Sequence, residues 1–257
     1  MLLSFILIPF VTALLLLFIK NDKSANTVAI VSTLGTLVAA LVVAGNGAVD
    51  FNAPWIPVLN AQFLLHADGL AKILVLLTAI SFPAIIIATS QNQPKQKNIF
   101  LSLLLFTQCG LMGVFLSGDA LLFYFFWELA LIPVYFLSSI WGGEKRIAVT
   151  FKFFIYTFLG SLMMLIGIVF VYMHTSDQSF LIQSFAKANL TGGQQVTAFA
   201  LFFIAFAIKM PIFPLHTWQP DAYEQAPTAV TMVMSAVMVK MGLYGILRWL
   251  LPLFPTA

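Results

Sequence analysis

Long apolar runs recur along the whole chain and limit what it can fold into. Runs close to the length of a membrane-spanning helix lie at Leu2–Ile19, Ala25–Ala44, Leu70–Thr89, Ile99–Leu116, Ala120–Ile140, Val149–Met173, Val196–Leu215 and Thr228–Leu250. Backbone polar groups in lipid must be satisfied within their own segment, so each run is predicted to be a helix. Because a span needs about 20 apolar residues, the expected fold class is an all-α, polytopic membrane helix bundle of about eight transmembrane helices.

The composition agrees with this class. Apolar residues make up 61% of the chain and charged residues 8%, against about a quarter charged in soluble domains. The 12 basic and 9 acidic residues give a formal charge of +3 but form no basic patch, which argues against nucleic-acid binding. The single cysteine, Cys109, excludes a disulfide framework and a cysteine-based metal site, and its apolar neighbours predict a buried core residue.

No soluble domain or linker separates the apolar runs, so residues 1–257 are predicted to form a single transmembrane domain. Met1–Ile19 has no basic start and no small-residue cleavage site, and we expect a retained helix there rather than a signal peptide. Two connections are longer than the rest. Gly45–Gly69 contains Trp55, which would suit an interfacial anchor, and Ser179–Leu190 is expected to form a short surface helix.

Basic residues fall in alternate connections, which predicts the orientation of the chain in the membrane. The first, third and fifth connections hold the basic pairs Lys20 and Lys23, Lys95 and Lys97, and Lys145 and Arg146. Lysine and arginine favour the cytoplasm, so these connections are predicted inside and the N-terminus outside. The connection with Asp221 and Glu224 has no basic residue, but alternation places it on the cytoplasmic side as well.

The seventh apolar run is interrupted by a lysine and two prolines. Pro211 cannot donate to the carbonyl of Ala207, and Pro214 cannot donate to the carbonyl of Met210. Free carbonyls and room for water are therefore expected beside Lys209. Irregular backbone at membrane depth is tolerated only where it is buried or lines a wet cavity, so this helix is predicted to be broken at a functional site.

Three ionisable residues fall inside predicted spans. They are Glu128 in the fifth run, Lys209 in the seventh and Lys240 in the eighth. A central charge costs about 2.5–3.5 kcal/mol on insertion scales, so each should face protein or water, and we predict that Glu128 pairs with Lys209. A lysine in such a site can take up and release a proton. The alternative is a static ion pair that only fixes helix packing.

The remaining titratable residues give weaker signals. His216 lies beyond the prolines and is either a satisfied interfacial histidine or part of a proton relay. The residues near helix ends, Lys72, Lys152 and Arg248, are predicted to extend toward the membrane surface. His66 and His174 lie in connections, and no partner can be predicted for either. The sequence has no nucleotide-binding glycine loop, haem motif or hydrolase motif.

Several long motifs resemble one family. They are PWIP at Pro54–Pro57, DGL at Asp68–Leu70, FFWELALIPVYFL at Phe125–Leu137, KFFIYTFLGSLMML at Lys152–Leu165 and KMPIFPLHTWQPDAYEQAPTAV at Lys209–Val230. With these motifs the chain resembles the antiporter-like membrane subunits of respiratory complex I, and among them the subunit M type (chain 4 in mitochondria). The resemblance covers nearly the whole sequence.

The resemblance implies a proton-translocating subunit of a multisubunit NADH:quinone oxidoreductase, driven by quinone reduction elsewhere in the complex. Glu128 would modulate Lys209, Lys240 would be a central relay, and His216 would belong to the cytoplasmic entry. The implied partners are other membrane subunits, lipid and protons. NADH, FMN, iron–sulfur clusters and quinone would lie in partner subunits, with no cofactor or metal in this chain. The implied location is the bacterial cytoplasmic (inner) membrane.

Two departures from the family pattern stand out. Tyr223 occupies a position where the family often has a histidine, which puts a relay through that position in doubt. The family also has about fourteen helices in two inverted repeats of about five each. Residues 1–97 would hold helices 1–3 and residues 98–257 the first repeat, helices 4–8, with the second repeat absent. A truncated or split reading frame, or a separate second chain, would account for this.

Two other functions stay open from the sequence. A subunit of a multisubunit sodium/proton antiporter would share the Trp127-Glu128 pair and the Lys209 motif, whereas the LIP and PWIP pieces favour complex I. An inert assembly scaffold left by truncation is the third possibility.

Overall fold

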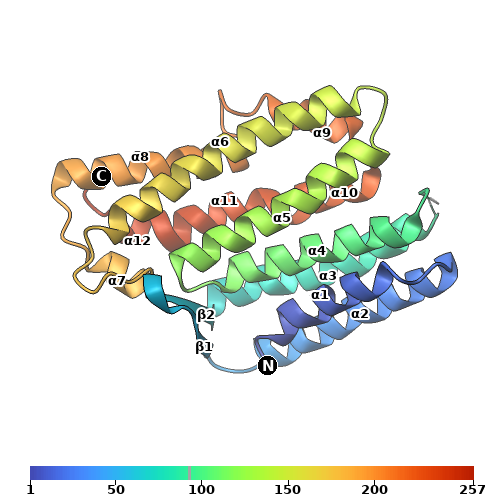
Figure 1. The fold of residues 1–257 in the computed structure, drawn as a ribbon, viewed down its shortest axis with the longest axis horizontal. Helices are drawn as coiled ribbons and strands as arrows, with labels where there is room; N and C mark the ends of the chain where they lie inside the picture. The colour runs from blue at the N-terminus through green and yellow to red at the C-terminus, as the bar shows by residue number, and fades with distance from the viewer. Residues whose placement is uncertain (92–93) are drawn as a thin grey trace.

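The computed structural model describes residues 1–91 and 94–257, most of them in helices that run along one common direction (Figure 1). The N-terminal elements are α1 (Ser4–Leu16), α2 (Asp22–Ala44), β1 (Val49–Ile56), η1 (Pro57–Leu59), β2 (Ala61–Ala67) and α3 (Gly69–Gln91). The central helices are α4 (Lys97–Leu116), α5 (Ala120–Trp141), α6 (Arg146–Tyr172), α7 (Ile182–Ala186) and α8 (Gly192–Lys209). The last elements are α9 (Trp218–Gln225), α10 (Thr228–Val233), η2 (Met234–Met238), α11 (Val239–Gly245), η3 (Ile246–Leu250) and α12 (Leu251–Leu253).

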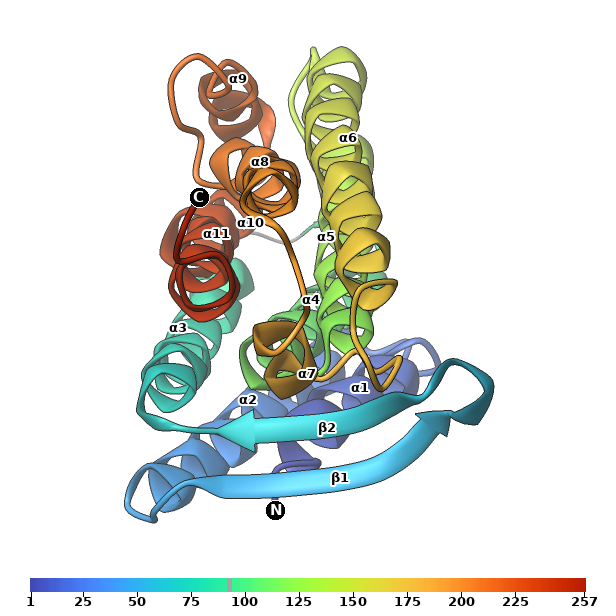
Figure 2. The same cartoon turned by 90° about the vertical axis from the view of Figure 1, so that its left-hand side faces the viewer.

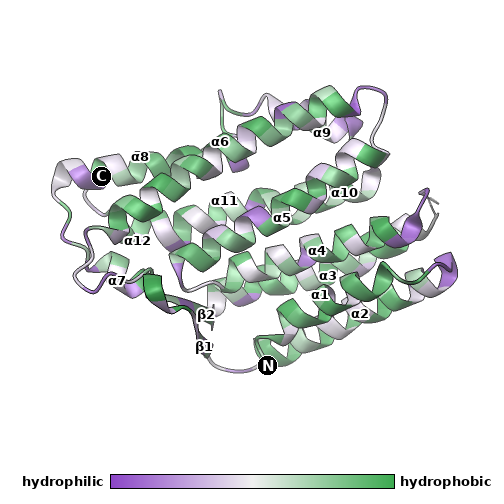
Figure 3. Ribbon diagram, in the orientation of Figure 1, coloured by the Kyte–Doolittle hydropathy of each residue, from purple (hydrophilic) through white to green (hydrophobic). Residues whose placement is uncertain are grey.

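Within the described residues, 7 helices are long and apolar enough to cross a membrane, and the α1 helix is a shorter apolar helix. Each of these eight segments overlaps one of the eight predicted runs, so the predicted polytopic bundle is confirmed. Hydrophobic residues follow the lengths of the spans, and hydrophilic residues gather toward their ends (Figure 3). The α1–α2 and α5–α6 connections lie at the same end of the bundle as α9, as the alternation of basic connections predicts (Figure 1). We call this end the α9 end.

Polar side chains start several of these helices. Asn21 accepts hydrogen bonds from the amides of Lys23 and Ser24 at the start of α2, and Thr191 and Gln194 form a capping box at the start of α8. Such caps satisfy amide groups that have no partner inside the helix. They fix where the chain enters each span.

The eighth span, Thr228–Leu253, is less regular than predicted. Two π-helical turns, η2 and η3, interrupt it on either side of α11. Such turns insert a residue into the helix, change the direction of the residues that follow, and occur often at functional sites. Lys240 lies on α11 between the two turns.

The connection from Gly45 to Gly69 forms a β-hairpin, an element that was not predicted from the sequence and that adds to the helical bundle. Strands β1 and β2 pair antiparallel with Asp50 opposite His66, and the register shifts between Pro54 and Ile56. Trp55 lies at this irregularity and packs edge-on against Phe125 of α5, with ring centroids 5.5 Å apart. It therefore anchors the hairpin to the bundle and is not simply an interfacial side chain.

The hairpin crosses one end of the bundle beside α7 (Figure 2). Gly118 donates to the carbonyl of Leu64, and the carboxylate of Asp119 accepts from the amides of Gln62, Leu121 and Leu122. Burial raises the pKa of Asp119, although these three amides favour its charged form. One side chain thus caps α5 and fixes β2 to it. The α7 helix is shorter than the predicted Ser179–Leu190 helix, and it buries its phenylalanine Phe185.

The α4 helix is the most buried span and packs closely against α5. A Cβ atom built on Gly110 would lie 2.5 Å from the backbone nitrogen of Ala130. Backbone atoms inside a packed bundle cannot move away at low cost. Glycine at this position therefore sets the distance between α4 and α5.

We expect Gly110→Ala to destabilise the protein by about 1–3 kcal/mol, the usual cost of overpacking a core. The matched control is Gly35→Ala in α2, where nothing lies within 4 Å of the added Cβ. The thermal unfolding midpoint in detergent should fall for Gly110→Ala and stay unchanged or rise for Gly35→Ala. Equal midpoints for the two variants would contradict the close α4–α5 contact.

Candidate functional site

The α8 helix ends at Lys209, which confirms the predicted break in the seventh span. The chain leaves the helix sooner than the predicted limit at Leu215. One detail of the prediction is wrong, because the carbonyl of Ala207 is not free and accepts a hydrogen bond of 3.0 Å from the amide of Ile212. The wider turn after Lys209 brings this amide to the carbonyl that Pro211 cannot reach.

The side chain of Trp218, the first residue of α9, covers the C-terminal end of α8. Its indole N–H donates to the carbonyl of Ile208 over 2.9 Å, and only 2% of the residue is exposed. Its ring packs on Phe153 of α6 with centroids 5.1 Å apart. Trp218 was not among the site residues predicted from the sequence, where its only signal is a tryptophan within a polar segment.

Lys209 itself lies among aromatic rings. It is 2% exposed, and its Nζ atom has no hydrogen-bond partner among the described residues. This Nζ atom lies 5.6 Å from the ring centroid of Trp127 and 6.0 Å from that of Phe153. Aromatic faces attract a cation electrostatically, so these rings partly replace the water that an ammonium group loses on burial.

Glu128 follows Trp127 on α5 and interacts electrostatically with Lys209. The two groups do not form a direct ion pair, because none of the four ion pairs found within 4.0 Å among the described residues joins them. Rings, rather than the carboxylate, lie next to the ammonium group. Glu128 and Lys209 therefore influence each other over a distance longer than 4.0 Å, and not through the direct contact that a pair implies.

The Glu128 side chain is half-buried and lies near the Ser161 hydroxyl of α6 and the phenol of Tyr124. It also lines an apolar groove of about 280 Å³ on the outer face of α5, beside Trp55 and Phe125. The carboxylate therefore lies between the interior that holds Lys209 and the outer surface of the bundle.

Lys240 is not joined to these two groups by any contact in the described part of the chain. Its Nζ atom donates to the carbonyl of Ser235, one turn earlier on the same span. The helix that carries it does reach α8, because a Cβ atom on Gly242 would lie 2.7 Å from the carbonyl oxygen of Phe206. The structure thus brings α11 against the end of α8 but leaves the Lys240 ammonium group directed elsewhere.

His216 lies in the connection between α8 and α9, with its ring 5.6 Å from that of Phe213. It is half-buried, and its Nδ1 atom has no hydrogen-bond partner among the described residues. Tyr223 on α9 is also half-buried, and burial raises the pKa of its phenol. Both residues are at the α9 end, so the structure groups His216 with the end of α8 but shows no contact to Lys209.

The α9 helix is held by contacts that the sequence analysis missed. Lys152 of α6 donates to the carboxylate of Asp221 over 2.7 Å and to the carbonyl of Thr217 over 2.8 Å. The Tyr156 hydroxyl lies 2.9 Å from the Thr217 hydroxyl, and the amide of Gly143 donates to the carbonyl of Gln225. Lys152 is therefore paired and does not simply extend to the membrane surface as predicted.

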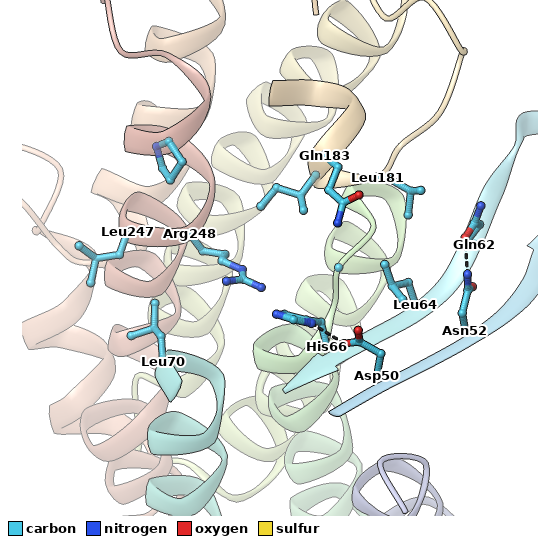
Figure 4. A pocket seen from close by; sticks show the side chains of 13 residues that line it. Asp50, Asn52, Gln62, Leu64, His66, Leu70, Leu181, Gln183, Leu247 and Arg248 are labelled. Atoms are coloured by element: carbon cyan, nitrogen blue, oxygen red, sulfur yellow. Dashed lines mark hydrogen bonds and ion pairs between the residues drawn. The ribbon is translucent and has the colours of Figure 1, made fainter. Parts of the chain in front are cut away.

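A second charged cluster lies at the opposite end, in a cavity of about 520 Å³ between the hairpin, α7 and η3 (Figure 4). His66 has a partner after all, because its Nδ1 atom meets the carboxylate of Asp50 across the strand pair. Arg248 reaches from η3 and pairs with Asp68, so it does not extend freely to the surface as predicted. This cluster ties the hairpin, the start of α3 and the last span together.

Lys72, near the start of α3, and His174, in the connection after α6, also have partners. Lys72 was predicted to extend toward the membrane surface, and its ammonium group donates to the carbonyls of Asn46 and Gly47 in the connection after α2. His174 lies within hydrogen-bonding distance of the carbonyl of Phe170 and of the amide of Gln194. The carbonyl of Phe170 is a local partner one helical turn before His174, whereas Asn46, Gly47 and Gln194 are 20 or more residues from the side chains they bind, and no local pattern reveals those contacts.

Asp68 gives a testable pH dependence. Burial opposes its charge, but the Ala71 amide and the Arg248 guanidinium together hold the pKa of Asp68 below its usual value. A lowered folded-state pKa stabilises the fold above the ordinary aspartate pKa of about 3.9, and this contribution is lost as the pH falls through the lowered value. Asp68→Asn, which can still accept from Ala71, should therefore lower the thermal midpoint at pH 7.

The difference between Asp68→Asn and the parent protein should shrink between pH 7 and pH 3, because the parent progressively loses the contribution of the Asp68 charge as the pH falls below the ordinary aspartate pKa of about 3.9. Asp22→Asn on the exposed first turn of α2 is the matched control, with a small effect expected at both pH values. A midpoint difference that does not change with pH would contradict a role for the Asp68 charge.

A membrane bundle whose seventh span breaks at a buried lysine, with a glutamate on the fifth span, is the arrangement of an antiporter-like membrane subunit. The family model described as NADH:quinone oxidoreductase/Mrp antiporter, TM, matches residues 117–257. The chain belongs to this family.

Individual relatives agree with this assignment. NADH-quinone oxidoreductase subunit M of Rhodobacter capsulatus is 40% identical over 91% of this chain and 49% of the relative. Subunit M of Escherichia coli K12 is 39% identical over 81% of this chain and 43% of the relative. The chain thus spans about half the length of the curated relatives it matches.

Solved structures share the fold. A chain of respiratory complex I from Thermus thermophilus matches with a TM-score of 0.89 and 29% identity over 100% of this chain and 54% of that chain. A chain of the Mrp complex from a Dietzia species matches with a TM-score of 0.87 and 24% identity over 99% of this chain and 49% of that chain. The second likeness concerns the fold alone.

Proposed function

We propose that this chain is a proton-translocating membrane subunit of a multisubunit NADH:quinone oxidoreductase. The observation that carries the proposal is the position of Lys209, buried at the end of a broken span within the electrostatic reach of Glu128. An ionisable group at membrane depth is costly, and in transporters it commonly marks an ion path. The bacterial relatives are named as subunits of NADH-quinone oxidoreductase, which supports the proposed complex.

In the proposed mechanism Lys209 carries the proton. A nearby carboxylate favours the ammonium form of a lysine, so moving Glu128 relative to Lys209 changes how firmly the proton is held. The aromatic walls keep bulk water away and strengthen this coupling, because charges interact more strongly in a medium of low polarity. Energy from quinone reduction in partner subunits would drive the change in distance.

The rest of the path involves the other predicted residues. His216 would admit protons from the α9 end, and Lys240 would receive them from Lys209 after its side chain turns away from the carbonyl of Ser235. The basic connections at the α9 end support a cytoplasmic location for it, with the N-terminus outside in the bacterial cytoplasmic membrane. Other membrane subunits and lipid would complete the environment.

We expect Lys209→Met, which keeps the volume of the side chain but not its charge, to abolish proton pumping by the assembled complex. Pumping is measured as acidification inside inverted vesicles on addition of NADH. Lys187→Met, in the connection between α7 and α8, is the matched control and should pump normally. Normal pumping by Lys209→Met would refute the proposal.

A sodium/proton antiporter subunit is the second candidate, favoured by the shared fold of the Mrp complex chain. The two functions differ in their energy source. Vesicles that contain the complex should acidify with NADH in the absence of a sodium gradient if the first function holds. Proton movement that needs a sodium gradient and ignores NADH would favour the antiporter.

A further inference from the structure

We propose that α9 and the connection before it, residues 210–225, form a lid over Lys209, and that Lys152 and Asp221 are positioning residues that latch it. This inference rests on the proposed function, because it assigns control of access to the same lysine. Trp218 is the part of the lid that covers the end of α8.

The site around Lys209 is closed in this structure. Lys209 and Trp218 are each 2% exposed, and the Trp218 indole is hydrogen-bonded to the carbonyl that directly precedes Lys209. Phe153 touches both, because its ring packs on Trp218 and lies below the Lys209 ammonium group. A lysine that exchanges protons must meet water at some stage, so this arrangement is a closed state that has to open.

The segment that can move is the connection before α9 together with α9. The connection before α9 packs loosely, with Phe213 81% exposed and Pro214 and Thr217 also exposed. The α9 helix has only 8 residues and buries two of them, Trp218 and Ala222. Segments with few buried apolar contacts open at lower cost than the core around them.

The latch is the contact of Lys152 with this segment. Lys152 on the long α6 helix binds the segment at two points, the carbonyl of Thr217 and the carboxylate of Asp221. These points lie on either side of Trp218, so one ammonium group holds the tryptophan in place from both directions. The ion pair is partly exposed, with 38% of the Lys152 side chain and 47% of the Asp221 side chain accessible. Such a pair is weak enough to open and close during turnover.

The test uses the assembled complex in nanodiscs with a thiol reporter beneath the lid. Thr157 is 3% exposed and lies on α6 between Phe153, which faces Trp218, and Gly160, which faces Ala205 and Ile208. Thr157→Cys is a small change, and Cys109→Ala removes the native thiol, which is buried in α4. The rate of labelling by a charged methanethiosulfonate reagent then reports how often the lid opens.

We expect slow labelling at rest and faster labelling when NADH and quinone are supplied. Asp221→Asn and Lys152→Gln should raise the resting rate by up to about fivefold, the largest population change that loss of one exposed ion pair produces. Lys152→Arg should label like the parent, because arginine can donate to both acceptors. Glu144→Gln, which removes an exposed carboxylate at the same end, is the matched control and should also label like the parent.

The dependence on turnover separates a latch from a purely structural contact, which would alter the resting rate of the variants but not respond to NADH in the parent. Equal labelling of the parent at rest and in turnover overturns the proposal, as does an unchanged resting rate in Asp221→Asn. The proposed function fails separately, since Lys209→Met tests pumping without the reporter.

Discussion

The cost of placing an ammonium group inside a membrane bundle governs the structure around Lys209. The group is buried without a hydrogen-bond partner among the described residues, and the protein compensates with two aromatic faces and a carboxylate on α5. The helix also ends at this site, because Pro211 and Pro214 have no backbone N–H group to continue its hydrogen bonds. The indole of Trp218 then satisfies a carbonyl that the helix end leaves open. The end of α8, the aromatic rings around Lys209 and the segment that covers it therefore all serve to accommodate one buried charge.

The two ends of the bundle are built differently. At the α9 end, a short helix is held over the broken span by exposed polar contacts such as the Lys152–Asp221 pair. At the hairpin end, Asp119 fixes β2 to α5 through three amides, and Asp68 links the start of α3 to Arg248 of the last span. Asp119 is buried and Asp68 is half-buried, and multiply bonded carboxylates of this kind hold an element more firmly than exposed pairs do. The hairpin end is thus the fixed frame, and the α9 end is where movement costs least.

Sequence reasoning predicted the parts that depend on local composition. The eight apolar segments, the break after Lys209 and the selection of Glu128 all follow from what lipid and proline forbid. The hairpin escaped prediction although Val49–Ala53 alternates apolar and polar residues, because Pro54 and Pro57 interrupt that pattern and Asp50 and His66 pair across 16 positions of sequence. The partners of Lys152 and Arg248 escaped for a similar reason, since Asp221 and Asp68 are 69 and 180 residues away.

The sequence by itself determined the class of the molecule, its number of spans and the residues whose charge the membrane makes costly, because these depend on transfer of each segment from water to lipid. The tertiary structure alone decided how Lys209 is surrounded. It placed rings of α5 and α6 beside the ammonium group, kept Glu128 at a distance without a direct ion pair, and turned Lys240 toward Ser235. Those outcomes depend on the packing of helices that are far apart in the chain, and no local pattern of residues contains that information.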